Sequence, residues 1–136
     1  WCHMLMILET RDRAVMTDED AERLVDALRA EVGEALRVVA TYDEDGYEAF
    51  YVREDAAPRV RDRADAVHED LVLQGLGRGH LEDLFDAGPL QCSMHRFDEL
   101  TAFHFATGEF EGLFVSVDSG ADVPLASFAG TCKEFL

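Results

Sequence analysis

The sequence predicts an α+β domain built on a five-stranded antiparallel sheet. Apolar residues recur at helical spacing in three stretches, near the start, the middle and the end of the chain. Two short stretches rich in β-branched and aromatic residues follow the first helical stretch, and three more follow the second. The predicted order is therefore α-β-β-α-β-β-β-α. Strands joined by short turns, with helices before, between and after them, form a layered α+β domain.

One domain is expected over residues 17–136, with an extension before it. A chain of 136 residues that is 48% hydrophobic has the size and the apolar content of one domain with one core. Trp1 is not a start methionine, whereas Met16 stands directly before the acidic run of the first predicted helix. We expect residues 1–16 to be a tag remnant or a flexible segment.

The N-terminal third of the domain is predicted to form a helix and a β-hairpin, over residues 18–32, 36–42 and 47–53. Thr17 or Asp18 can cap the helix, and its acidic first turn complements the helix dipole. Gly33 ends the helix. The turn at 43–46 ends in Asp-Gly, which permits the positive φ of a tight hairpin.

A long helix is predicted in the middle of the chain, with Pro58 at its first position. Its inner face is expected to carry Val60, Ala64, Val67, Leu71 and Gln74. The glycine-rich stretch 75–79 is expected to end this helix, and a short helix is expected over 80–85.

The C-terminal third is predicted to form a three-stranded meander and a final helix, over residues 90–97, 101–107, 110–118 and 124–136. Residues 98–100 and the Gly108-Glu109 pair supply the tight links between the strands. Pro124 stands at the start of the final helix, which carries Cys132 on its apolar face.

The charge of the chain indicates a salt-adapted cytoplasm. The formal net charge is −17, from 29 acidic and 12 basic residues, and Lys133 is the only lysine. Carboxylates keep a surface hydrated in concentrated salt, and arginine is more weakly hydrated than lysine. We therefore expect a halophilic, haloarchaeal source, with an acidic protein of a mesophile as the alternative.

Charge and hydropathy disfavour two classes of partner, and the cysteine content indicates a reducing compartment. Nucleic acid binding needs a basic surface, which the sequence lacks. No apolar run approaches the roughly 20 residues that span a bilayer, so no membrane partner is expected. The cysteines at 2, 92 and 132 are odd in number and lack CxxC spacing, which is typical of reduced cytoplasmic thiols.

Four stretches of the chain resemble a family of small uncharacterised haloarchaeal proteins, a domain-of-unknown-function family. They are HEDLVLQG at 68–75, HLEDLF at 80–85, CSMHRF at 92–97 and GLFVSVD at 112–118. The order of elements over 18–136 also resembles the roadblock/LC7 fold, a compact relative of the profilin-like domains.

The roadblock resemblance implies a function through protein contacts. It implies a homodimer formed through the long middle helix and an edge strand, with residues 58–74 at the two-fold interface. It also implies a protein partner such as a small GTPase or a signalling component. We therefore expect a non-enzymatic cytoplasmic adaptor or regulator without a cofactor. The glycine-rich stretch 75–79 departs from the pattern because it would end the helix early.

The partner-binding residues are expected on the middle helix and the stretch after it: Arg59, Val60, Arg61, Arg63, Val67 and Arg78. The three arginines at 59–63 form the basic cluster that stands out against the acidic background, and they would suit an acidic partner. The alternative is a solvated helix face with local ion pairs, since acidic residues interleave with the arginines.

An alternative function is a small ligand- or metal-binding sensor or enzyme that uses His95, His104 and Cys92. The two histidines lie on consecutive predicted strands, and a register in which paired numbers sum to 199 would place them directly opposite. Imidazole and thiolate are soft ligands for zinc. However, Cys92 and His95 are three residues apart, so they point to opposite faces of a strand.

Overall fold

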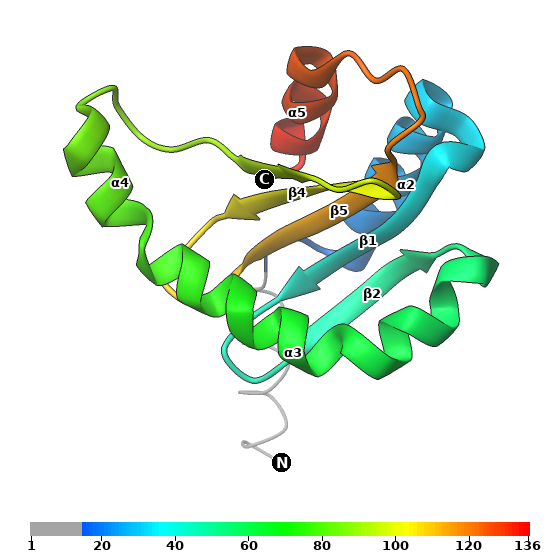
Figure 1. Ribbon diagram of the computed structural model, residues 1–136, viewed down its shortest axis with the longest axis horizontal. Coiled ribbons are helices and arrows are strands. Elements are labelled where there is room, and N and C mark those ends of the chain that lie inside the picture. The colour runs from blue at the N-terminus through cyan, green and yellow to red at the C-terminus, as the bar shows by residue number, and fades with distance from the viewer. Residues whose placement is uncertain (1–14) are drawn as a thin grey trace.

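The computed structural model describes residues 15–136 and confirms the predicted fold class (Figure 1). Its five strands form one antiparallel sheet in the order β2-β1-β5-β4-β3. The strands are β1 (Leu36–Tyr42), β2 (Tyr47–Val52), β3 (Ser93–Arg96), β4 (Leu100–Ala106) and β5 (Gly112–Asp118). The helices are α2 (Asp18–Val32), α3 (Ala57–Leu76), α4 (Arg78–Phe85) and α5 (Leu125–Glu134), with short 3₁₀ turns η1 (Gly33–Ala35) and η2 (Glu54–Ala56).

The helices lie on both faces of the sheet, as Figure 1 shows, with α2 and α5 on one side and α3 on the other. The α2 and α5 side holds the main core, which includes Leu24 and Leu28 of α2, Phe103 and Phe105 of β4, and Phe128 of α5. The ring centroids of Phe103 and Phe128 are 4.8 Å apart. A second, smaller cluster lies under α3, and this face of the sheet is covered less completely.

The first helix has the caps that its sequence predicts. Thr17 accepts a hydrogen bond from the backbone N–H of Asp20 at 3.1 Å, and Gly33 ends the helix with a φ of 61°. Residues 1–14 lie outside the described residues, so the expected extension stays a prediction for that segment. Val15 and Met16 pack against the main core.

The middle of the chain differs from the prediction at its glycines. α3 continues through Gly75 to Leu76, and Gly77 alone separates it from α4, which begins at Arg78 rather than at residue 80. A Cβ atom on Gly75 would lie 3.8 Å from the Tyr42 hydroxyl, so this glycine faces the sheet inside the helix. The packing of α3 on the sheet overrides the low helix propensity of glycine.

The first and last strands of the meander are shorter than predicted, and the middle one is shifted by one residue. β3 covers 93–96 rather than 90–97, because the N–H of Leu90 turns toward α4 and donates to the Glu82 carboxylate at 2.7 Å. β5 starts at Gly112 rather than at 110, because the N–H of Thr107 donates to the carbonyl of Glu111 and forms a wider turn.

The register that would place His95 directly opposite His104 does not form between β3 and β4. Phe97 N–H donates to the Leu100 carbonyl at 2.7 Å, so the link has two residues and Leu100 belongs to β4. The paired numbers therefore sum to 197: His104 lies opposite Ser93, and His95 lies opposite Ala102.

No helix within residues 15–136 is long and apolar enough to cross a bilayer.

An apolar groove between α3 and the sheet

A groove of about 990 Å³ lies between α3 and the face of the sheet that α2 and α5 leave open. Its floor is formed by alternate residues of the central strands, which point to the same face: Val38, Ala40, Ala102, Phe114 and Ser116. One wall is α3, through Val60, Ala64 and Val67. The other is the β3 end of the sheet, through His95 and Phe97. The groove is therefore mostly apolar and bordered by an edge strand.

The groove exists because α3 is attached to the sheet mainly at its two ends. Leu71 is the one buried residue of α3, and the side chain of Val67 remains 40% exposed. At the start of the helix, Ala56 and Val60 pack against Val38 and Ala40. Between these attachments the helix leaves space above the small residues of the floor.

An ion-pair network holds the N-terminal end of α3. Arg53 stands directly before η2, and its guanidinium binds the Asp118 carboxylate at 2.7 Å and the Asp55 carboxylate at 2.5 Å. Arg37 of β1 binds Asp118 at 3.1 Å. Hydrogen bonds from Arg53 and then Arg37 hold the pKa of Asp118 below its usual range. The network joins the start of α3 to the ends of β1 and β5.

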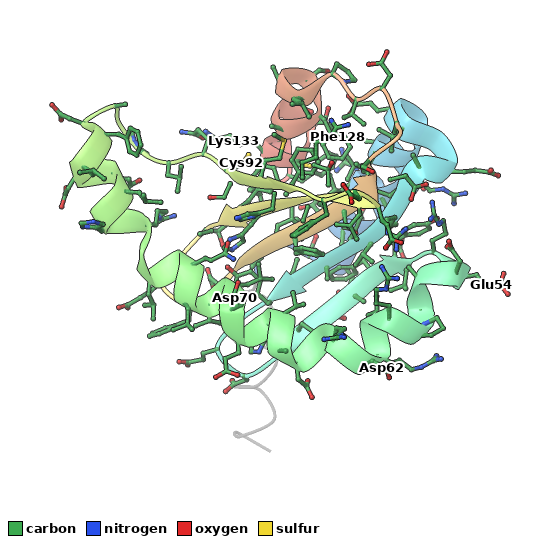
Figure 2. All side chains as sticks on the ribbon, viewed as in Figure 1. Glu54, Asp62, Asp70, Cys92, Phe128 and Lys133 are labelled. Carbon is green, nitrogen blue, oxygen red and sulfur yellow. The ribbon has the colours of Figure 1, made fainter. Side chains whose placement is uncertain are left out.

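A chain of hydrogen bonds holds the C-terminal half of α3. His104 Nδ1 lies 3.2 Å from Gln74 Oε1, and its Nε2 forms a short hydrogen bond with the Tyr42 hydroxyl. Gln74 donates from its amide nitrogen to Asp70 at 2.6 Å. Figure 2 shows Asp70 on α3. Each group finds a complementary partner when Tyr42 donates to Nε2 and Nδ1–H donates to Gln74, which is the neutral tautomer.

The surroundings of His104 and Tyr42 keep both of these side chains neutral. Burial, followed by the charge of His95, lowers the pKa of His104 to about 4. Burial raises the pKa of Tyr42 to about 12, although the nearby Arg78 acts in the opposite direction. At neutral pH the pair therefore joins β1, β4 and α3 as an uncharged hydrogen-bonded anchor.

The structure distributes the predicted partner-binding residues over several places. Val60, Val67, Arg59 and Arg63 line the groove. Arg59 binds Glu99 in the β3–β4 link at 2.9 Å and so bridges one end of the groove.

The two remaining predicted residues lie outside the groove lining. Arg61 is exposed and makes no ion pair within residues 15–136. Arg78 donates to the Ala106 carbonyl at 2.5 Å, which fixes the start of α4 to the end of β4.

The residues of the alternative metal or ligand site are only partly brought together. His95 and His104 both line the groove, but they are displaced by two residue pairs along the β3–β4 ladder. Cys92 packs on the opposite face against the main core, on the same side as Phe128 (Figure 2). Within the described part of the chain, no group of three or more His, Cys, Asp or Glu side chains could hold a metal ion.

Sequence reasoning missed the role of Tyr42 and underestimated that of Gln74. Tyr42 follows Val38 and Ala40 at two-residue spacing, which places all three on one face of β1. Gln74 continues the apolar stripe of α3 as its one polar member. The sequence shows a polar residue at the end of each apolar stripe, but it does not show that both residues bind His104.

The comparisons with known proteins agree with this architecture. A family model for a domain of unknown function, DUF7522, matches residues 22–136. The chain belongs to that family. No curated protein sequence matches the chain significantly.

Solved structures share the fold at low sequence identity. A roadblock/LC7 domain from Streptomyces avermitilis has a TM-score of 0.57 and 19% identity over 88% of this chain and 91% of that one. MglB from Myxococcus xanthus has a TM-score of 0.54 and 12% identity over 86% and 87%. An MglB with a tetrameric arrangement has a TM-score of 0.51 and 19% identity over 85% and 83%. This family member therefore has a roadblock/LC7-like fold.

Proposed function

We propose that the protein is a non-enzymatic regulatory adaptor of a halophilic archaeal cytoplasm, which acts as a homodimer and binds another protein. The observation that carries the proposal is the open apolar groove beside the edge strand β3. A groove of this size with apolar walls is a surface for association. Its one buried histidine serves to anchor α3, since Tyr42 and Gln74 take both ring nitrogens.

The edge of the sheet supports the dimer. β3 has one strand neighbour, and the apolar side chains of Met94 within it and Phe97 directly after it are 44% and 58% exposed. An edge strand with exposed apolar residues is prone to pair with another chain. We propose that β3 and α3 of two copies meet around a two-fold axis, which closes the assembly at two subunits.

The partner surface is proposed on the outer face of α3, around Arg61. A free cationic group on a chain with a net charge of −17 favours an acidic partner, and a small GTPase or another signalling protein is the class that we propose. Asp62 beside it is also exposed (Figure 2), so the surface is mixed rather than uniformly basic.

A charge reversal at this position tests the partner surface. We expect Arg61→Glu to weaken binding to small GTPases of the source organism, loaded with GTP or GDP, by about tenfold. Binding is measured by interferometry in molar potassium chloride. Arg23→Glu on the exposed face of α2 is the matched control and should bind as the unaltered protein does. No binding of any GTPase by the unaltered protein would overturn the GTPase version of the proposal.

A further inference from the structure

α4 is a short helix with an apolar face that nothing within residues 15–136 of the same copy covers. Leu81, Leu84 and Phe85 are 40%, 67% and 73% exposed. Figure 1 shows α4 at one end of the molecule, beyond the C-terminal end of α3. Clustered large apolar side chains on a surface as acidic as this one indicate a contact with another protein surface.

The position of α4 keeps it out of the groove of its own chain. Arg78 ties the start of α4 to the Ala106 carbonyl, and Glu82 accepts a hydrogen bond from the N–H of Leu90. None of the residues that line the groove comes from the segment 78–92. The described part of the chain therefore carries an apolar groove and, outside it, an exposed apolar helix that does not line the groove.

We propose that α4 of a second copy occupies the groove, with its apolar residues against the floor between α3 and β3. This inference rests on the proposed dimer and names the segment that each subunit contributes to the other. A two-fold axis makes the exchange reciprocal, so both grooves and both α4 helices are covered in one closed dimer.

Charge complementarity supports this occupant. Arg63 lines the groove and makes no ion pair within the part of the chain that the structure describes. α4 presents the exposed Asp83, and Asp86 follows at its C-terminal end. Asp70 and Asp98 also line the groove, so the favourable charge contact is the local one between Arg63 and an acidic residue of α4.

Concentrated salt removes the main obstacle to this contact. Two copies with a net charge of −17 each repel one another at low ionic strength. At about 1 M salt the Debye length is about 3 Å, so the general repulsion is screened while apolar contacts persist.

Disulfide trapping between two differently marked copies tests the exchange directly. One copy carries Leu84→Cys in α4 and the other carries Val67→Cys in the groove wall, both with Cys2 and Cys92 replaced by serine. Mild oxidation of the mixture in molar potassium chloride should give a covalent heterodimer as the main product. The control pairs Leu84→Cys with Leu125→Cys, which is 45% exposed on α5 across the sheet, and should give little product.

The outcomes separate this inference from the dimer on which it rests. A mixture that sediments as a dimer without trapping the Leu84→Cys and Val67→Cys pair overturns the α4 exchange and leaves the dimer standing. A mixture that sediments as a monomer overturns both.

A second variant measures the contribution of α4 to the affinity. Phe85→Asp should weaken dimerisation at least about tenfold, the effect of losing one buried aromatic anchor. Leu125→Asp, at a position on α5 that is 45% exposed against 73% for Phe85, should leave the affinity unchanged. Equal affinities for the two variants would contradict the exchange, and because both side chains are exposed in the monomer, neither change should impair folding.

Discussion

Replacing Gly112 by alanine is expected to destabilise the protein by about 3 kcal/mol or more. Gly112 begins β5 and lies between Tyr42 of β1 and Ala106 of β4. An added Cβ would clash with the Phe105 carbonyl oxygen and lie 2.7 Å from the Tyr42 hydroxyl. Backbone cannot move aside as a flexible side chain can, so the strands would have to separate close to the hydrogen bond between Tyr42 and His104. Thermal unfolding in molar potassium chloride measures the effect.

The same substitution at Gly130 provides the matched control. Gly130 lies inside α5, and an added Cβ would meet no atom within 4 Å among the described residues. Alanine has the higher helix propensity, so Gly130→Ala should raise the free energy of unfolding by about 0.5–1 kcal/mol. Equal stabilities for the two variants would contradict the close approach of β1, β4 and β5 at Gly112.

The buried His104 is expected to make the protein lose stability as the pH falls from about 6.5 to about 4. Its pKa is lowered to about 4 in the folded protein and returns to its ordinary value of about 6.5 in the unfolded chain. Between these values the unfolded chain binds more protons, so protonation favours unfolding. We expect a loss of about 2 kcal/mol, less than the full shift would give because solvent in the groove screens the charge.

A comparison of two histidine variants isolates this effect from the titration of the carboxylates. His104→Gln cannot protonate, so it should be less stable than the unaltered protein at pH 7 and approach or exceed its stability near pH 4. Denaturant unfolding across the pH range measures both. His80→Gln, on the exposed face of α4, should leave the pH profile unchanged. A stability difference between His104→Gln and the unaltered protein that is independent of pH would contradict the buried neutral imidazole.

The fold was predictable where local patterns and packing agree. The helix over 18–32 has a cap, an acidic first turn and a terminal glycine, and the structure reproduces its bounds. Glycine in a sequence favours a helix end, so the sequence predicts that the helix stops at Gly75. In the structure the helix continues, because Gly75 lets it pass close to the sheet. The register of β3 depended on whether the link after Phe97 had two residues or three, which only the hydrogen bond to Leu100 decides.

The candidate site was predictable in its residues more than in its arrangement. Val60 and Val67 were placed on the inner stripe of α3, and they line the groove. The sequence suggests the histidines as possible metal ligands. In the structure His104 is hydrogen-bonded to Tyr42, which lies 62 positions away in the chain. Cys92 was known from strand parity to face away from His95, and it packs in the main core. A contact between distant elements, such as that of Tyr42 with His104, leaves no periodic signal in the sequence.

The anchoring of α3 at both ends explains why one face of this sheet remains available. Arg53 and Asp118 hold the start of the helix, while Gln74 and His104 hold its last turns. Between these anchors, small residues of the sheet such as Ala102 do not fill the space under the helix, which leaves the groove. Within residues 15–136, the sheet is therefore covered on the α2 and α5 side, while the α3 side keeps a groove.

Sedimentation equilibrium of the unaltered protein and of Ala102→Phe, in molar potassium chloride, tests most directly whether the groove joins two copies. Ala102 lies on the groove floor, so a phenylalanine ring would enter the space that the second copy needs without disturbing the main core. We predict twice the chain mass of 15.2 kDa for the unaltered protein and a folded monomer for the variant. A monomer in both cases, or an unchanged dimer for Ala102→Phe, would contradict the groove as the dimer interface.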